Sequence, residues 1–257
     1  MSTGSTSDTW ISCTRPNPAA RLRLFCLPYA GGGSTAFSSW QRQLPAQVEL
    51  CALKLPGREA RMREPPFDRL TPLVQALATG IAPWLTKPFV LYGHSLGALV
   101  SFEVTRELRR RRAPLPRHLL VSGRRPPHMQ PGPEPLHGAS DQALVAWLRR
   151  VGGTPDEVLR EPELLAMILP VLRADISVNE AEPFVEEDPL ECPISVFGGL
   201  ADERASRAEL EAWRRHTRGP FGVEMFPGGH FFLQSAREPF LRSLSAHLED
   251  VLRDLPA

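Results

Sequence analysis

Short apolar runs alternate with longer segments of helical spacing along most of the chain, and this alternation restricts the possible folds more than any other feature. Gly or Pro closes each run, which is typical of strands buried on both faces of a sheet. A chain that alternates strand and helix forms a mostly parallel sheet with helices on both faces. We predict strands at residues 22–29, 48–55, 89–93, 118–122, 194–198 and 223–226, and helices at residues 72–85, 96–110, 205–217 and 239–255.

Residues 125–189 interrupt the alternation with a Pro-rich stretch and two helical patterns, at 141–151 and 162–177. This segment leaves the sheet at the carboxyl end of a predicted strand, and parallel sheets bind their ligands at such ends. It is therefore predicted to be a helical lid over the functional site, with a plain helical decoration as the alternative. The polar residues 1–20 are predicted to be a flexible arm, so that residues 21–257 form a single domain.

Charge and cysteine usage exclude several classes of function. The 257 residues include 30 basic and 29 acidic side chains, and the formal charge of +1 provides no field for nucleic acid or an anionic membrane. No apolar run approaches the roughly 18 residues of a spanning helix, and the N-terminus lacks the pattern of a secretion signal. The four cysteines form no CxxC pair. We expect a cytoplasmic monomer that needs no metal or cofactor and binds neither nucleic acid nor membrane.

The strongest local motif is a GxSxG sequence at residues 93–97, directly after a predicted strand and directly before a predicted helix. A strand that turns sharply into a helix needs small residues on both sides of the turn, and Gly93 and Gly97 provide them. Such a turn exposes Ser95 at the edge of the sheet, at the positive end of the helix. An ordinary Gly-rich turn is the alternative, but the position between strand and helix favours Ser95 as a nucleophile.

A serine nucleophile needs a base within hydrogen-bonding reach. Of the seven histidines, His230 alone follows a predicted strand through a flexible loop, the PGG sequence at residues 227–229. This loop leaves the sheet at the carboxyl edge, where Ser95 is also expected. His230 is therefore the predicted general base.

A third group must hold the base in the correct orientation. Asp202 comes just after the predicted strand at residues 194–198, at the same edge of the sheet, and we predict that it is this acid. Because Asp202 also precedes the predicted helix at residues 205–217, a helix cap is the alternative role. Asp175 and Asp188, both within the lid, are weaker candidates for the acid.

Acyl transfer through a serine also needs two backbone donors for the oxyanion. The amide of Leu96, the residue after the nucleophile, is predicted to supply one of them. The second is assigned to Ala30 in the loop PYAGGG at residues 28–33, where consecutive glycines let the backbone approach a ligand. A phosphate cradle is the alternative use of such a loop, but the GxxxxGK[ST] motif is absent and the chain has only two lysines.

Taken together, these residues resemble the stand-alone type II thioesterases of polyketide synthase and nonribosomal peptide synthetase pathways. The resemblance covers nearly the whole chain, and it includes an Asp, Asp202, directly after the fifth predicted strand. Its most specific motifs are LPYAGG at residues 27–32, LPGRE at 55–59, GHSLG at 93–97 and GGHFF at 228–232.

This resemblance implies both a fold and an activity. The fold would be an α/β-hydrolase with a helical lid. The activity would be the hydrolysis of acyl thioesters on the phosphopantetheine arm of an acyl or peptidyl carrier protein, which removes stalled or aberrant acyl groups. The family roles fall on Ser95 as nucleophile, His230 as base, Asp202 as orienting acid, and Ala30 and Leu96 as oxyanion donors.

A carrier protein is typically acidic, so basic residues at the active edge are its candidate contacts. They follow the second predicted strand and the strand at the root of the lid, and each has solvated surface charge as its alternative. These residues are Arg58, Arg61, Arg63, Arg124 and Arg125.

Other functions are compatible with the same triad. They are an esterase or lipase for small free esters, an acyltransferase that passes the acyl group to another acceptor, and a binding module that has lost the chemistry. Several aromatic residues are candidates for an acyl channel, with ordinary core packing as the alternative. They are Phe37, Trp40, Phe102, Trp147 and Phe184.

Overall fold

A seven-stranded sheet forms the centre of the computed structural model, which describes residues 9–13, 15–129, 136–180 and 182–256. Among the described strands, β1 is antiparallel to β3 and every other neighbouring pair is parallel, as predicted. Across the sheet the strands are β1 (Ile11–Ser12), β3 (Val48–Leu53), β2 (Leu22–Leu27), β4 (Phe89–His94), β5 (His118–Ser122), β6 (Ile194–Gly199) and β7 (Phe221–Phe226).

Side chains of the central strands are buried on both faces of the sheet. Along β2, Leu24 and Cys26 belong to the core on one face, whereas Phe25 and Leu27 belong to the core on the other. This two-residue alternation follows from the pleat of a strand. It explains why the strands appear in the sequence as continuous apolar runs rather than as alternating patterns.

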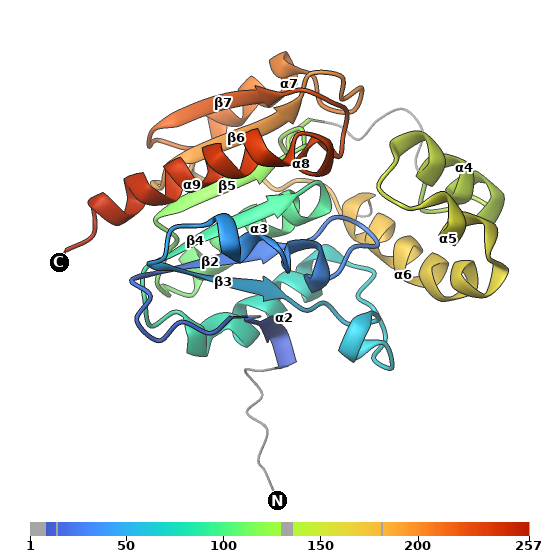
Figure 1. Ribbon diagram of the computed structural model, residues 1–257, viewed down its shortest axis with the longest axis horizontal. Coiled ribbons are helices and arrows are strands. Elements are labelled where there is room, and N and C mark those ends of the chain that lie inside the picture. The colour runs from blue at the N-terminus through green and yellow to red at the C-terminus, as the bar shows by residue number, and fades with distance from the viewer. Residues whose placement is uncertain (1–8, 14, 130–135, 181, 257) are drawn as a thin grey trace, which may run out of the picture.

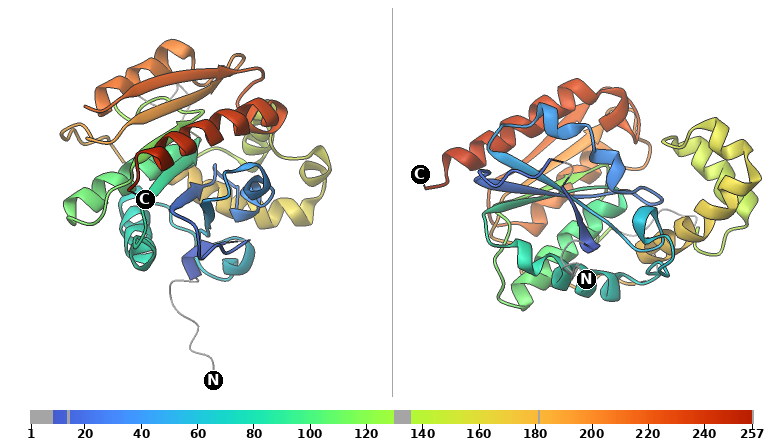
Figure 2. Two further views of the ribbon diagram at one scale, coloured as in Figure 1. Left: turned by 60° about the vertical axis from the view of Figure 1, so that its left-hand side comes forward. Right: turned by 60° about the horizontal axis from the view of Figure 1, so that its bottom comes forward.

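Helices cover both faces of the sheet (Figure 1 and Figure 2). The helices on one face share the core that contains Phe25, and those on the opposite face share the core that contains Leu24. The first group is α2 (Leu70–Ile81), α3 (Leu96–Arg110) and α7 (Arg207–Glu211), and the second is α8 (Phe232–Ser235) and α9 (Arg237–Arg253).

The described part of the lid segment, which was predicted at residues 125–189, lies at the end of the sheet toward which the parallel strand arrows point (Figure 1). Its helices pack around a small apolar cluster of their own that includes Leu144, Leu159 and Leu172. The described lid helices are α4 (Asp141–Val151), α5 (Asp156–Arg160) and α6 (Pro162–Glu180). The sequence predicted α4 and α6 but not α5, because five residues are too short to show a helical period.

The flexible arm predicted for residues 1–20 needs correction in its described part, residues 9–13 and 15–20. Ile11 pairs with Leu53 of β3 and is 4% exposed, and the amide of Asn17 donates to Glu49 at 2.8 Å. A strand of two residues, β1, has too few positions to show an alternating pattern.

The other predicted elements agree with the structure to within a few residues at their ends. The described residues include five short 3-10 helices, at Ser34–Phe37, Trp40–Gln43, Glu59–Arg61, Ala82–Trp84 and Ala212–His216. The last two form the final turns of the helices predicted at residues 72–85 and 205–217. Within the described ranges, no helix combines the length and the apolar character needed to cross a bilayer.

The order of the strands reverses at β2, which pairs with β3 on one side and with β4 on the other. The loops that follow β2 and β4 therefore diverge at the carboxyl edge, and such a switch point opens a crevice in which ligands bind. Ala30 follows β2 and Ser95 follows β4. The topology thus places the predicted nucleophile and the predicted oxyanion loop beside the same crevice.

Candidate active site

Ser95 lies in a strained turn between β4 and α3. Its φ of 55° and ψ of −112° are rare for a residue with a side chain. The flanking glycines make this turn possible, because a Cβ on Gly93 would lie 2.0 Å from the Gly97 carbonyl oxygen, and a Cβ on Gly97 would lie 2.2 Å from the Leu27 carbonyl oxygen. The amide of Ser95 donates to the Ser122 carbonyl at 2.8 Å, which ties the turn to β5. The GxSxG sequence therefore forms the sharp strand-to-helix turn that it predicted.

His230 and Asp202 form a buried hydrogen-bonded pair on the loops after β7 and β6. His230 Nδ1 lies 2.8 Å from Asp202 Oδ2, and the two side chains are 5% and 1% exposed. The other carboxylate oxygen, Oδ1, accepts the amide of Arg204 at 3.0 Å. With Nδ1 donating to the carboxylate, the imidazole has a fixed orientation and its Nε2 atom is left as the acceptor.

Ser95, Asp202 and His230 all line one cavity of about 1540 Å³. Nε2 of His230 is buried and makes no hydrogen bond to a described residue. No described side chain or backbone group therefore competes for the lone pair of Nε2. Hydrogen bonds between a nucleophile and its base are often long before substrate binds and shorten in the reacting complex.

Burial lowers the pKa of His230 below its ordinary value of 6.5 because it disfavours the imidazolium. The hydrogen bond to Asp202 and the charge of its carboxylate act in the opposite direction, and the charges of Arg204 and Arg124 lower the pKa further. The net direction keeps His230 neutral near pH 7. A neutral imidazole is the form that a general base requires.

The pH dependence of hydrolysis tests this balance. Because protonated His230 cannot accept a proton from Ser95, we expect kcat/KM to fall on the acid side with an apparent pKa below 6.5. Arg204→Gln removes a charge that lowers this pKa, so its acid limb moves to higher pH. Arg207→Gln, at an exposed ion pair with Glu211, serves as the control and leaves the limb in place. An acid limb above pH 6.5 in the wild-type enzyme would contradict the assignment.

The predicted oxyanion donors lie on the two loops beside the switch point. Leu96 is the first residue of α3, so its amide is one of those that a helix leaves without an intrahelical partner. In the loop after β2, the amide of Gly31 donates to Asp175 and that of Gly32 donates to the Tyr29 carbonyl. Two of the three glycine amides of this loop are thus engaged. The assignment of the second oxyanion donor to Ala30 stays a prediction.

The two weaker candidates for the acid lie away from the imidazole. Asp175 binds Arg58 and the amide of Gly31. Asp188 is 83% exposed, and its nearest charged partner is Arg218 at 3.6 Å. Asp202 is thus the candidate that contacts His230.

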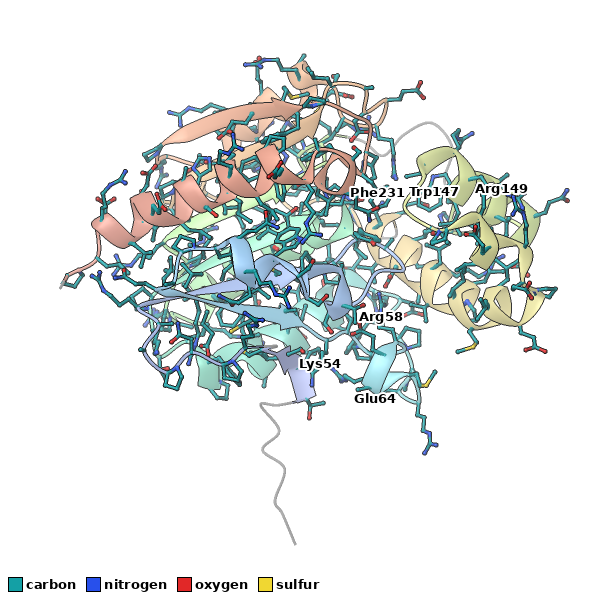
Figure 3. The ribbon with its side chains drawn as sticks, viewed as in Figure 1. Lys54, Arg58, Glu64, Trp147, Arg149 and Phe231 are labelled. Carbon is teal, nitrogen blue, oxygen red and sulfur yellow. The ribbon has the colours of Figure 1, made fainter. Side chains whose placement is uncertain are left out.

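Three of the five predicted docking arginines are held by internal contacts, which corrects their expected role as exposed charges. Arg58 forms a bidentate pair with Asp175. It lies at the edge of the sheet that faces the lid helices (Figure 3). Arg61 is 8% exposed, pairs with Glu64 and lies over the ring of Trp10 at 4.1 Å. Asp175 lies 117 residues after Arg58, so no local pattern reveals that pair. For Arg61 the carboxylate partner is only three residues away, but the ring of Trp10 comes from a distant part of the chain.

Arg124, the third of these residues, lines the active-site cavity instead of the outer surface. Its guanidinium donates to the side chain of Asn179 at the end of α6. Burial lowers the pKa of Arg124 to about 9. The remaining two candidates are more accessible: Arg63 is exposed, and Arg125 is 28% exposed in an ion pair with Glu209.

Sequence reasoning missed Arg204, which lines the cavity and lies over the ring of Trp147 at 5.2 Å. Its place two residues after the predicted acid was a signal that could have identified it. Of the five aromatic channel candidates, Trp147 and Phe184 line the cavity. Phe37, Trp40 and Phe102 are buried in the cores on the two faces of the sheet.

The parallel sheet with its switch point, the strand-to-helix turn at Ser95 and the Asp–His pair on later loops are the features of the α/β-hydrolase fold, and the predicted fold class is confirmed. Among the described residues, no group of three or more His, Cys, Asp or Glu side chains could hold a metal ion.

Comparison with known proteins identifies the family. The family model described as "Thioesterase domain" matches residues 22–248, and the chain belongs to this family. It is 41% identical to the gramicidin S biosynthesis protein GrsT of Aneurinibacillus migulanus, over 95% of each chain. It is 36% identical to the thioesterase PikA5 of Streptomyces venezuelae, over 94% of this chain and 86% of PikA5.

A solved structure agrees with this assignment. RedJ, a thioesterase from the prodiginine biosynthetic pathway of Streptomyces coelicolor, superimposes with a TM-score of 0.84 at 43% identity. The match covers 89% of this chain and 86% of RedJ. The sequence prediction of a thioester hydrolase related to polyketide and nonribosomal peptide pathways is thereby confirmed at the level of the family.

Proposed function

We propose that the chain hydrolyses acyl thioesters carried on the phosphopantetheine arm of an acyl or peptidyl carrier protein, and so removes stalled or aberrant acyl groups. The observation that carries the proposal is the cavity that contains both Ser95 and the His230–Asp202 pair, in a chain of the thioesterase family. The names of its relatives, which include a gramicidin S biosynthesis protein and a thioesterase of prodiginine biosynthesis, support the pathway context.

In the first step the acyl group passes to Ser95. Ser95 Oγ adds to the thioester carbonyl carbon while His230 Nε2 accepts the hydroxyl proton, and the carbonyl electron pair moves to oxygen. The amides of Leu96 and Ala30 stabilise the resulting oxyanion. When the tetrahedral intermediate collapses, the C–S bond breaks and the proton on His230 passes to the departing pantetheine sulfur.

In the second step water releases the acid. The oxygen of water adds to the ester carbonyl carbon of the acyl-enzyme while His230 accepts a proton from that water. The amides of Leu96 and Ala30 stabilise the second oxyanion as they did the first. Collapse breaks the bond to Ser95 Oγ, which recovers its proton from His230. The products are a free carboxylic acid and the original enzyme.

Arg63 is the strongest of the predicted docking residues that the structure leaves accessible. It is exposed, and it follows β3 on the stretch that continues from the Arg58 turn at the carboxyl edge of the sheet. An acidic carrier surface could pair with the positive charge of Arg63 without breaking an ion pair inside the protein. Arg125 is the second candidate, but its ion pair with Glu209 must be shared or exchanged.

The proposal predicts a preference for the carrier-bound thioester. We expect kcat/KM on an acyl-carrier protein to exceed that on an oxygen ester of the same acyl group by at least about tenfold, because carrier contacts and charge complementarity favour the encounter. Steady-state rates on the acyl-carrier protein, on acyl-pantetheine and on the matched oxygen ester measure this preference.

The charge reversal Arg63→Glu tests the docking residue. We expect it to lower the rate of hydrolysis of the acyl-carrier protein severalfold at low salt and to leave the rate on acyl-pantetheine unchanged. Arg117→Glu, an exposed residue at the opposite edge, serves as the control.

Two outcomes would overturn the proposal. Faster turnover of the oxygen ester than of the carrier thioester would make the chain an esterase. Transfer of the acyl group to an added amine or alcohol in place of water, seen in the products, would make it an acyltransferase.

We further propose that the enzyme acts as a monomer in the cytoplasm. Sedimentation of the purified protein tests the oligomeric state, and fractionation of the producing cell tests the location.

A further inference from the structure

A buried ion pair connects the lid to the loop that carries Ala30. Asp175 of α6 accepts two bonds from Arg58: Nη2 donates to Oδ1 and Nη1 donates to Oδ2, each at 2.7 Å. The side chains of Arg58 and Asp175 are 9% and 3% exposed. The pair thus joins the turn after β3 to a lid helix 117 positions later in the sequence.

The same two side chains hold the loop after β2 from both sides. Asp175 Oδ2 accepts the amide of Gly31 at 2.7 Å, and Arg58 Nη1 donates to the carbonyl of Gly32 at 3.0 Å. Gly31 has a φ of +75°, a conformation that favours glycine. Glu59 fixes the next part of the loop, because its carboxylate accepts the amides of Ser34 and Thr35.

Ala30 directly precedes the amide that Asp175 binds. The peptide between Ala30 and Gly31 therefore has its N–H fixed by the lid, and this limits the directions in which the Ala30 amide can point. Buried ion pairs seldom add net stability compared with apolar packing. Stability alone therefore does not explain why a charged pair occupies this site, whereas the need for one fixed loop geometry does.

We propose that Asp175 is a positioning residue for the oxyanion hole: with Arg58, it fixes the loop after β2 so that the Ala30 amide faces the reacting carbonyl oxygen. This inference rests on the proposed two-donor oxyanion hole. Because Asp175 belongs to α6, the second donor is in place only while this lid helix is seated against Arg58.

Asp175→Asn tests the proposal. The variant keeps the size of the side chain but loses the charge and one acceptor, so the loop is held less firmly. We expect kcat to fall by about 10- to 100-fold, less than the full loss of an oxyanion donor, while KM stays near its wild-type value. Hydrolysis of an acyl-pantetheine and of a 4-nitrophenyl ester measures both constants. Neither substrate includes a carrier protein, so the test stands even if the carrier is not the natural partner.

Glu49→Gln is the matched control. Glu49 is also a buried carboxylate that accepts one arginine, Arg23 at 2.9 Å, and one backbone amide, Asn17 at 2.8 Å, but it lies near the amino end of β3. Both variants should lower the melting temperature, because each leaves a largely covered arginine without its carboxylate. Only Asp175→Asn should lower kcat. Equal effects of the two variants on kcat, or wild-type kcat in folded Asp175→Asn, would overturn the proposal.

Arg58→Lys provides a second test that does not depend on the folding of Asp175→Asn. Lysine keeps the charge but cannot form the bidentate pair or reach Gly32 in the same geometry. We expect an intermediate fall in kcat with KM unchanged. In the double variant with Asp175→Asn, the loss should be close to that of Asp175→Asn alone, because both changes release the same loop. Losses that multiply would show that the two residues act separately and would contradict the proposal.

Discussion

Ser95→Ala lowers turnover of an acyl thioester by about 10⁴- to 10⁶-fold, the loss expected when a triad loses its nucleophile. The physical reason is that no other described hydroxyl lies in the strained turn between β4 and α3. In the proposed mechanism, the amide of Leu96 and the imidazole of His230 act at the carbonyl that this hydroxyl attacks. Single-turnover and steady-state rates on acyl-pantetheine measure the loss.

Ser101→Ala is the control for this result. Ser101 belongs to the same helix, α3, and is fully buried, so its replacement repeats the chemical change without touching the cavity. We expect turnover close to that of the wild-type enzyme. If Ser95→Ala kept a rate similar to Ser101→Ala, attack by Ser95 would not be the reaction.

Asp202→Asn is expected to have the next largest effect, with kcat lower by about 10²- to 10⁴-fold. The asparagine amide donates to His230 Nδ1 where the carboxylate accepted, so the proton moves to Nε2. Nε2 then cannot accept the proton of Ser95. The melting temperature of the variant shows whether it is folded when the rate is measured.

The same variant has a signature in its pH profile. Asp202 raises the pKa of His230 through its hydrogen bond and its charge. Without it the pKa falls further, and the acid limb of the residual activity moves to lower pH. Asp188→Asn, an exposed residue that sequence reasoning kept as a weaker candidate, should change neither the rate nor the limb. A large loss in Asp188→Asn with little loss in Asp202→Asn would reverse the assignment.

Much of the fold could be predicted from the sequence because the strands are buried on both faces. Residues such as Leu24 and Phe25 alternate between two cores, and this gives uninterrupted apolar runs that are easy to locate. The strand β1 and the helices α5 and α8 were missed because they have two, five and four residues. Their existence depends on tertiary contacts, such as the pairing of Ile11 with Leu53, rather than on a periodic pattern.

The catalytic candidates could be found for two different reasons. Ser95 lies in a contiguous motif, and its two flanking glycines are required because a Cβ at either position would clash with nearby backbone atoms. His230 and Asp202 are far apart in the chain, but parallel strands bring their carboxyl ends to one edge, so the order of strands was sufficient to relate them.

The arginines show where this reasoning fails. Arg58 and Arg61 follow a strand at the active edge, as docking residues should, yet each is held by contacts inside the protein. The exposure of Arg58 depends on a distant side chain, because Asp175 reaches it from a lid helix. A pattern of single residues carries no information about such pairs.

The most direct test of the central claim is covalent labelling with a fluorophosphonate, which captures a serine activated by a neighbouring base. The account predicts one phosphonyl group on the peptide that contains Ser95, with thioesterase activity lost in proportion to labelling and no label on Ser95→Ala. Labelling of a different residue, or complete labelling of Ser95 with thioester hydrolysis retained, would contradict it.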